Sequence, residues 1–194
     1  MSSPRLILIS GANGAGKSTL TKRLGNRFGE RFGQLLDPDA VAKLIAPEHP
    51  RTAGIEAARA VLHAIDLSFE RRERLVIETT LSERNRHTDV LQKARSLGYK
   101  TWLFYIGLRD VDLHMERVQQ RFFVGGHDVP DADILRRFER SRANLPAAIW
   151  LADRTMIYDN SGRDFKLVAS LEYGNLRRSS GTGWWTPLLP VSEE

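Results

Sequence analysis

The stretch GANGAGKSTL, from residue 11 to residue 20, contains the residue types that hold nucleotide phosphates. It matches the pattern G-x-x-x-x-G-K-[ST]. Glycines let the backbone curl so that successive N–H groups point at phosphate oxygens, and a following helix adds its unpaired N-terminal donors. A lysine here reaches the β- and γ-phosphates, and the hydroxyl can ligate Mg²⁺. We therefore expect ATP and Mg²⁺ to bind at Gly11, Ala12, Asn13, Gly14, Ala15, Gly16, Lys17, Ser18 and Thr19.

The elements on either side of this loop are those that such a loop requires. Leu6 to Ile9 are apolar and predict a short buried strand, and a helix is expected from about Lys17 to Phe28. Further helices are expected at about residues 52–71 and 84–97, and two arginine-rich helices follow, split by VGGHDVP. The other expected strands are residues 34–36, 75–77, 101–107, 155–158 and 165–169, and the last two could form a hairpin across DNSGR.

Strands that alternate with helices predict an α/β fold with a parallel sheet and helices on both faces. A chain of 194 residues fits one domain. We expect a P-loop kinase-like domain over residues 1–175, with an arginine-rich helical lid at about residues 117–142 and an irregular tail at residues 176–194. In that tail, Trp184 and Trp185 could anchor a partner or cover an apolar patch of the protein's own surface.

Composition limits the classes of protein to consider. The chain has no cysteine, which excludes disulfides and thiolate metal sites. No stretch approaches the length of a membrane span, and the apolar run near residue 6 is too short for a signal peptide, so we expect a cytoplasmic protein. The net charge is +5, yet seven arginines and seven acids balance between residues 109 and 142. We therefore do not expect nucleic acid as a partner.

The phosphate loop identifies a nucleoside triphosphate site without specifying a reaction. GTPase switches read guanine through an Asn-Lys-x-Asp loop, which this sequence lacks. Motor ATPases usually carry an apolar strand that ends in Asp, often followed by Glu, whereas the strand in LVIETT ends in Glu78 and is followed by two threonines. A small kinase fits these features better.

Phosphoryl transfer to a hydroxyl needs a carboxylate near the acceptor. Asp37 and Asp39 follow the expected second strand, and ligands bind at the carboxyl ends of parallel strands. We interpret Asp39 as the general base, the alternative being that it caps a helix that begins near Val41. Glu78, Thr79 and Thr80 end the next strand and could bind Mg²⁺, its waters or the acceptor, or the threonines could cap the following helix.

Arginines placed by helices suit a lid that stabilises the charge of the transferred phosphoryl group. Arg117 and Arg121 share one helical face and precede Gly125 and Gly126, a natural hinge, with His127 in the same loop. The alternative is that these arginines form solvent-exposed ion pairs with neighbouring acids. We interpret Arg117 and Arg121, together with Lys17, as the cations that hold the moving phosphoryl group.

Several segments together resemble the zeta-toxin family of P-loop kinases, especially its short free-standing bacterial members. They are GANGAGKSTL, DPDAVAKL, VIETTLS, TWLFYIGL, ERVQQRFFVGGHDVP and MIYDNS, and they run from about Leu6 to Asn160. The resemblance implies ATP- and Mg²⁺-dependent phosphorylation of a hydroxyl on a nucleotide sugar, UDP-N-acetylglucosamine, with an antitoxin protein as a candidate partner. It implies roles for Lys17 and Ser18 at the phosphates and Mg²⁺, Asp39 as general base, Glu78 as the acid that ends the strand, and Arg117 as a phosphate contact.

The sequence departs from the family pattern at two places. His127 stands where the family has a second lid arginine, and a glutamate on the helix before VIETT has no clear counterpart, with Arg59 and Glu56 nearby. These departures affect the acceptor more than ATP, whose base we expect near Asn160. The expected acceptor-binding residues are Asp39, Glu78, Thr79, Thr80, Arg59 and His127, and the expected metal ligands are Ser18 and Glu78.

Two other functions are compatible with the phosphate loop. A polynucleotide 5′-hydroxyl kinase would show a steep salt dependence of RNA or DNA binding. A nucleotide-binding interaction module would hydrolyse little ATP and would use the tryptophans of the tail to hold its partner.

Overall fold

The computed structural model describes residues 4–49, 52–123 and 129–190. The strands are β1 (Arg5–Ser10), β2 (Gln34–Leu36), β3 (Leu75–Thr79), β4 (Lys100–Gly107), β5 (Arg154–Asp159), β6 (Lys166–Glu172) and β7 (Asn175–Ser179). The α-helices are α1 (Lys17–Phe28), α2 (Pro38–Ile45), α3 (Gly54–Glu70), α4 (Arg84–Ser96), α5 (Val111–Phe123) and α6 (Asp131–Leu151). Two 3₁₀ turns, η1 (Gly29–Arg31) and η2 (Thr186–Leu188), complete the described elements.

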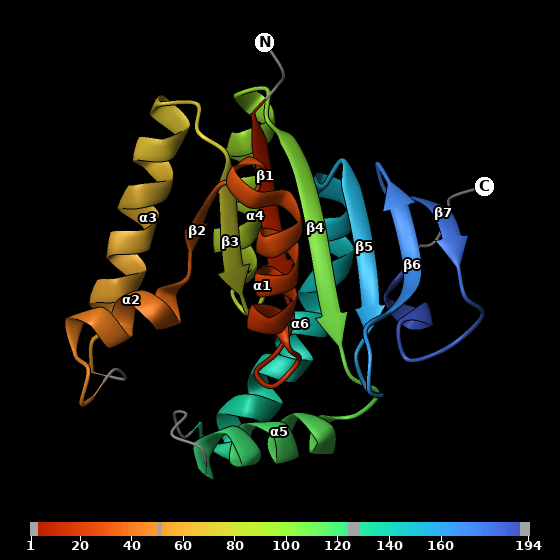
Figure 1. The fold of residues 1–194 in the computed structure, drawn as a ribbon. Coiled ribbons are helices and arrows are strands. Elements are labelled where there is room, and N and C mark those ends of the chain that lie inside the picture. Colours follow the sequence, from red (N-terminus) through yellow and green to blue (C-terminus); the bar gives the residue numbers. More distant parts are fainter. Residues whose placement is uncertain (1–3, 50–51, 124–128, 191–194) are drawn as a thin grey trace.

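The sheet has seven strands in the order β2-β3-β1-β4-β5-β6-β7. The first five are parallel, whereas β6 and β7 add as antiparallel strands at one edge. The predicted α/β fold is therefore confirmed, and so is the hairpin across DNSGR, which joins β5 to β6. In Figure 1 the arrowheads of β1, β3, β4 and β5 all point to one edge of the sheet, where the phosphate loop, α2 and α5 lie.

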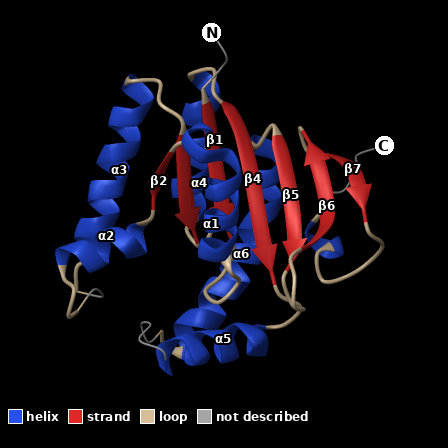
Figure 2. Ribbon diagram, in the orientation of Figure 1, coloured by secondary structure: helices blue, strands red, loops and turns tan. Residues whose placement is uncertain are grey.

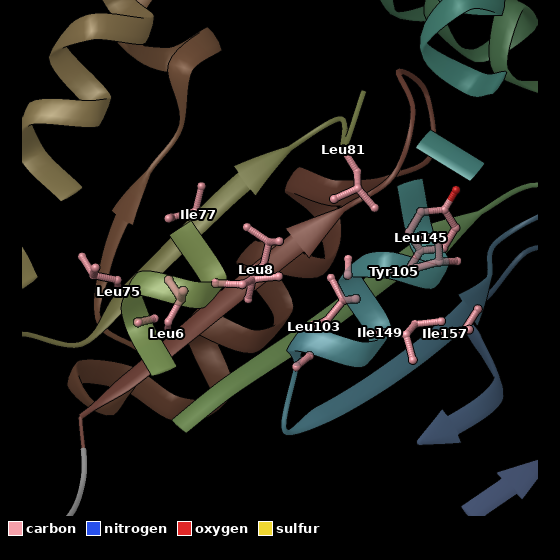
Figure 3. Close-up of a cluster of buried hydrophobic side chains, with 14 of the residues drawn as sticks. Leu6, Leu8, Leu75, Ile77, Leu81, Leu103, Tyr105, Leu145, Ile149 and Ile157 are labelled. Atoms are coloured by element: carbon pink, nitrogen blue, oxygen red, sulfur yellow. The ribbon is translucent and has the colours of Figure 1, made fainter. Parts of the chain in front are cut away.

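Both faces of the central strands are buried under helices, as Figure 2 shows. In β1, Leu6 and Leu8 face a cluster with residues of α3, α4 and α6, which Figure 3 shows in part. Ile7 and Ile9 face the other way and pack with Leu20 of α1. Side chains of a strand alternate between the two faces of its sheet, so a continuous apolar run such as LILI fits a strand that is covered on both sides.

The register of the sheet places polar strand ends beside the phosphate loop. Ile9 is level with Glu78, and Ser10 is level with Thr79. Gly11 follows Ser10 directly, so the loop leaves β1 where β3 presents its last two polar side chains. The parallel pairing of two strands thus joins motifs that lie far apart in the chain, with Ser18 and Glu78 separated by 60 residues.

The expectation of an irregular tail is wrong in part. β7 pairs with β6, since an edge strand supplies free backbone partners, and the expected domain limit at residue 175 falls on the first residue of β7. Beyond it, Trp185 is buried in the larger core cluster, and the ring of Trp184 lies 6.3 Å from that of Tyr105. The Arg142 guanidinium donates to the Trp184 carbonyl oxygen at 3.0 Å. The tryptophans therefore cover the protein's own surface.

Replacing Trp185 by alanine should lower the free energy of unfolding by about 3–5 kcal/mol, because it would empty a well-packed position in the core. Leu44→Ala is the control, since the Leu44 side chain is 82% exposed and its loss should change stability by less than about 0.5 kcal/mol. Equilibrium unfolding in urea measures both values. A similar small change for the two variants would show that the tail does not contribute to the core.

Candidate active site

The phosphate loop adopts backbone angles that favour glycine. Gly14 has φ of 77° and Gly16 has φ of 101°, both in the left-handed region. A Cβ on Gly16 would also lie 2.6 Å from Nδ2 of Asn160. That amide donates to the Ala15 carbonyl oxygen at 2.9 Å, so the segment after β5 holds the loop in its curled shape.

Lys17 begins α1 and folds over the loop. Its Nζ donates to the carbonyl oxygens of Gly11 and Ala12 at 2.9 and 3.2 Å. Burial lowers the pKa of Lys17, whereas the neighbouring carboxylates of Asp39, Glu78 and Asp37 act to raise it. The ammonium therefore lies within the electrostatic reach of Asp37, Asp39 and Glu78.

The residues present fit a Mg²⁺ ion. The Ser18 hydroxyl donates to Oε2 of Glu78 at 3.0 Å, and the Glu78 side chain is buried. Mg²⁺ is usually held by one or two protein oxygens, with phosphates and waters as its remaining ligands. A hydroxyl and a carboxylate in contact, next to a phosphate loop, supply that donor set.

α2 begins at Pro38, three residues before the expected start near Val41, because proline is favoured in the first helical position. The helix cap is Asp37, whose Oδ1 accepts a hydrogen bond from the Asp39 N–H at 3.0 Å. The alternative that Asp39 is the cap is therefore wrong. Burial, together with the charges of Glu78 and Asp39, raises the pKa of Asp37. Asp39 lies in the first turn with its side chain on the cleft.

A cleft of about 850 Å³ contains these groups. Eight basic and four acidic side chains line it, so its net charge is positive. The basic ones are Lys17, Lys22, Lys43, Arg86, Arg121, Arg136, Arg137 and Arg140, and the acidic ones are Asp37, Asp39, Glu78 and Glu83.

The arginine-rich helices reach the cleft with different residues from those singled out in the sequence. Arg121 of α5 lines it as expected, but Arg117 is not among its lining residues and instead donates from Nη2 to the Asn160 carbonyl oxygen at 2.7 Å. From α6, Nη1 of Arg137 donates to Oδ1 of Asn13 in the phosphate loop at 3.1 Å. The structure therefore adds Arg137 to the candidate phosphate contacts.

The polar end of β3 also faces this cleft. Thr79 and Thr80 both line it, and neither caps α4, whose N-terminus is at Glu83 without a side-chain cap. Oγ1 of Thr79 lies 2.9 Å from Nε2 of His87, and Oγ1 of Thr80 lies 2.8 Å from the Ser82 hydroxyl.

A comparison with protein families decides between the classes that such a cleft permits. The sequence model of the zeta toxin family matches residues 1–166. The chain belongs to the zeta toxin family. An uncharacterized protein of Haemophilus influenzae is 30% identical over 135 residues, which cover 69% of this chain and 92% of that protein.

Solved structures show the same fold at low sequence identity. The PezAT toxin–antitoxin structure of Streptococcus pneumoniae has a TM-score of 0.67 at 17% identity and covers 88% of this chain and 72% of that chain. The AvrRxo1-ORF1:-ORF2 structure with ATP has a TM-score of 0.69 at 17% identity and covers 90% and 60%, respectively. A putative kinase of Chloroflexus aurantiacus has a TM-score of 0.56 at 22% identity, covering 72% and 78%. The P-loop kinase fold is confirmed, and membership of the zeta toxin family supports a nucleotide-dependent kinase.

Besides Arg117, several other expected site positions do not line the cleft or lie outside the described residues. Arg59 is exposed on α3 and does not line the cleft, because the helix turns its neighbour Ala58 toward it. His127, with the proposed hinge at Gly125 and Gly126, is outside the described residues. Thr19 is exposed in the first turn of α1.

Within the part of the chain that the structure describes, no helix combines the length and apolar character needed to cross a membrane.

Besides that of Arg137, a second contact to the phosphate loop of this zeta toxin family member could not be inferred from the sequence. His114 of α5 is buried, and its Nδ1 is hydrogen-bonded to the Asn13 carbonyl oxygen, which fixes it as a donor there. Burial lowers the pKa of His114 to about 4, and Lys17 and Arg117 contribute in the same direction. His114 is thus a neutral residue that ties α5 to the loop.

Glu78→Gln should raise the Mg²⁺ concentration needed for half-maximal activity by about 10- to 100-fold, because the amide keeps the contact with Ser18 but loses the charge. Glu83→Gln is a matched control, since Glu83 lines the same cleft and is paired with Arg86 at 3.0 Å. A Mg²⁺ titration of ADP release measures both. Equal shifts for the two variants would contradict a metal-binding role for Glu78.

Proposed function

We propose that this protein is an ATP- and Mg²⁺-dependent kinase that transfers the γ-phosphoryl group to a hydroxyl of a nucleotide-like small molecule. UDP-N-acetylglucosamine is the first candidate acceptor, on the basis of the family resemblance. The observation that carries the proposal is that one cleft is lined by Lys17 of the phosphate loop, by the hydrogen-bonded Ser18–Glu78 pair and by Asp39.

ATP would lie with its phosphates on the loop from Gly11 to Thr19 and its base near Asn160. The ATP in the AvrRxo1-ORF1:-ORF2 structure supports this nucleotide. Asn160 lies beside the loop, since its side-chain amide donates to the Ala15 carbonyl oxygen and its own carbonyl oxygen accepts from Arg117, and this supports the proposal. Ser18 and Glu78 would hold Mg²⁺, which would neutralise part of the charge of the phosphates.

In the transfer step, the acceptor oxygen forms a bond to the γ-phosphorus while the bond from that phosphorus to the β–γ bridging oxygen breaks. Asp39 takes the proton of the acceptor hydroxyl, and ADP leaves with the bridging oxygen. Lys17, Arg121 and Arg137 would stabilise the negative charge on the transferred group, because all three side chains line the cleft. The family resemblance implies that Arg117 contacts a phosphate. It would do so from its position beside Asn160, whose carbonyl oxygen it binds.

The charge of the cleft supports an anionic acceptor. Lys43, Arg86 and Arg140 line it in addition to the cations assigned to the triphosphate. Cations that line a cleft raise the local concentration of an anionic ligand. An acceptor that carries its own phosphates, as a nucleotide does, fits this excess.

The partner and location follow as parts of the same proposal. The PezAT structure is that of a toxin–antitoxin system, which supports an antitoxin protein as a partner of this chain. A kinase that consumes ATP and a nucleotide would act in the cytoplasm. Growth arrest on expression of the protein, relieved by co-expression of an antitoxin, tests the first of these statements.

The decisive experiment incubates the purified protein with Mg²⁺-ATP and a panel of UDP-N-acetylglucosamine, other nucleotide sugars, NAD and oligonucleotides with free 5′-hydroxyls. ADP release and the masses of new products are recorded. A small-molecule product heavier by one phosphate would confirm the proposal and identify the acceptor. Phosphorylated oligonucleotides would indicate a polynucleotide kinase, and absence of ADP would favour a binding module.

A further inference from the structure

A short chain of hydrogen bonds links the end of β3 to α4. The backbone N–H of Leu81 donates to Oγ1 of Thr79 at 3.2 Å, and the same oxygen lies 2.9 Å from Nε2 of His87. Leu81 has a positive φ of 58°, which is uncommon for leucine, so the turn that carries this N–H is held in place by its surroundings. Its side chain, which is 1% exposed, supplies that support.

The chain of bonds favours one tautomer of His87. The Thr79 hydroxyl oxygen accepts from the Leu81 N–H, and among the described residues Nε2 of His87 is the one acceptor within reach of its own proton. We therefore assign the hydroxyl as the donor to Nε2, which puts the ring proton on Nδ1. Burial, with a smaller contribution from Arg86, lowers the pKa of His87 to about 4, so the ring is neutral near pH 7.

Nδ1 of His87 is the ring nitrogen that is left without a protein partner in the described part of the chain. His87 is 8% exposed and is one of the residues that line it. Among the described residues, Nδ1 has no hydrogen-bond partner, yet it is not one of the polar atoms that are sealed from solvent. A ring held by Thr79 therefore offers its Nδ1 at a cleft that Glu78 and Thr80 also line.

We propose that His87 is a specificity-determining residue that donates a hydrogen bond from Nδ1–H to an oxygen of the acceptor, and that Thr79 positions its ring. This inference rests on the proposed kinase function. The neutral N–H suits an uncharged oxygen of the acceptor, such as a hydroxyl or an amide carbonyl. An anionic oxygen would bind more strongly to the guanidinium of Arg86, the neighbouring residue that also lines the cleft. His87 thus selects for a polar, uncharged part of the acceptor.

Two substitutions separate this role from a structural one. In His87→Gln, the longer side chain can reach Thr79 but leaves nothing at the position of Nδ1. In His87→Asn, the amide nitrogen occupies the position of Nδ1 and the contact with Thr79 is lost. With UDP-N-acetylglucosamine as acceptor, we expect the Gln variant to raise the acceptor KM by about tenfold, the value of one hydrogen bond, with the ATP KM unchanged. The Asn variant should stay within about threefold of the wild type.

The opposite order, with the Asn variant impaired and the Gln variant like the wild type, would mean that His87 only supports Thr79. ¹⁵N NMR of the free protein, with the His87 signals assigned through the Asn variant, tests the tautomer without any turnover. A proton on Nε2 would overturn the inference. If the wild type neither binds nor phosphorylates UDP-N-acetylglucosamine, the proposed acceptor fails together with this role. If only the order of the variants is reversed, the kinase function stands.

Discussion

Asp39→Asn is expected to lower kcat by about 10²–10⁴-fold while ATP still binds, because the amide cannot accept the proton of the acceptor hydroxyl. Asp39 lines the cleft in the first turn of α2, and its carboxylate is among the charges that act on Lys17. Its backbone N–H, which bonds to Asp37, is unaffected by the change. Initial rates of ADP release, with ATP affinity from equilibrium dialysis, measure the two effects separately.

Asp37→Asn is the matched control for this variant. Asparagine caps a helix about as well as aspartate, so α2 should keep its start and the protein its stability. We expect kcat to fall by less than about tenfold, since the Asp37 carboxylate is occupied by the backbone of α2. A larger loss of kcat for Asp37→Asn than for Asp39→Asn would identify Asp37 as the general base. The raised pKa of Asp37 would fit that role.

The parts of the site that could be predicted from the sequence are those in which a local pattern determines both shape and chemistry. The spacing of Gly11, Gly16, Lys17 and Ser18 encodes the curl of the loop and the helix that follows it. Glu78 could be predicted because β3 is a recognisable apolar strand and its carboxyl end must lie beside that of β1 in a parallel sheet. In both cases neighbouring residues in the chain carry the whole signal.

The parts that could not be predicted depend on contacts between distant segments. Arg137 and His114 meet Asn13 from 124 and 101 residues away. Nothing in the composition of α5 or α6 distinguishes these side chains from their neighbours, because the direction of each depends on how the two helices pack over the loop. The start of α2 was misplaced for a different reason: Asp37 and Asp39 are equally good caps, and Pro38 between them decides for the first.

The tail illustrates a third limit. β7 is short and its side chains are exposed, so it lacks the alternating apolar pattern by which half-buried strands are recognised. It forms because the edge of β6 offers backbone partners. The following segment then returns to the core, where Trp184 packs so closely on Gly107 that a Cβ there would lie 2.1 Å from the indole ring. A strand that forms mainly through backbone pairing with its neighbour is therefore hard to predict from its own sequence.

Replacement of Arg137 by alanine is expected to lower kcat by about 10²–10³-fold, with ATP affinity changed much less, because a guanidinium on the transferred phosphoryl group acts mainly on the charge of the transition state. In the free protein, Nη1 of Arg137 bonds to the side chain of Asn13, at the edge of the loop that receives the phosphates. Asn13 therefore holds the guanidinium beside the phosphate loop in the free protein, at the modest strength of a single hydrogen bond.

Arg136→Ala is the matched control for Arg137→Ala. Arg136 precedes Arg137 on α6 and lines the same cleft, but its Nη2 is paired with Oδ1 of Asp133 at 2.7 Å. The two variants remove the same charge from adjacent positions, so a general loss of positive potential would slow both equally. A loss in kcat confined to Arg137→Ala, measured in single-turnover reactions at saturating ATP, would require a directed contact with the reacting phosphate. Equal losses would instead reduce both arginines to a diffuse contribution to the charge of the cleft.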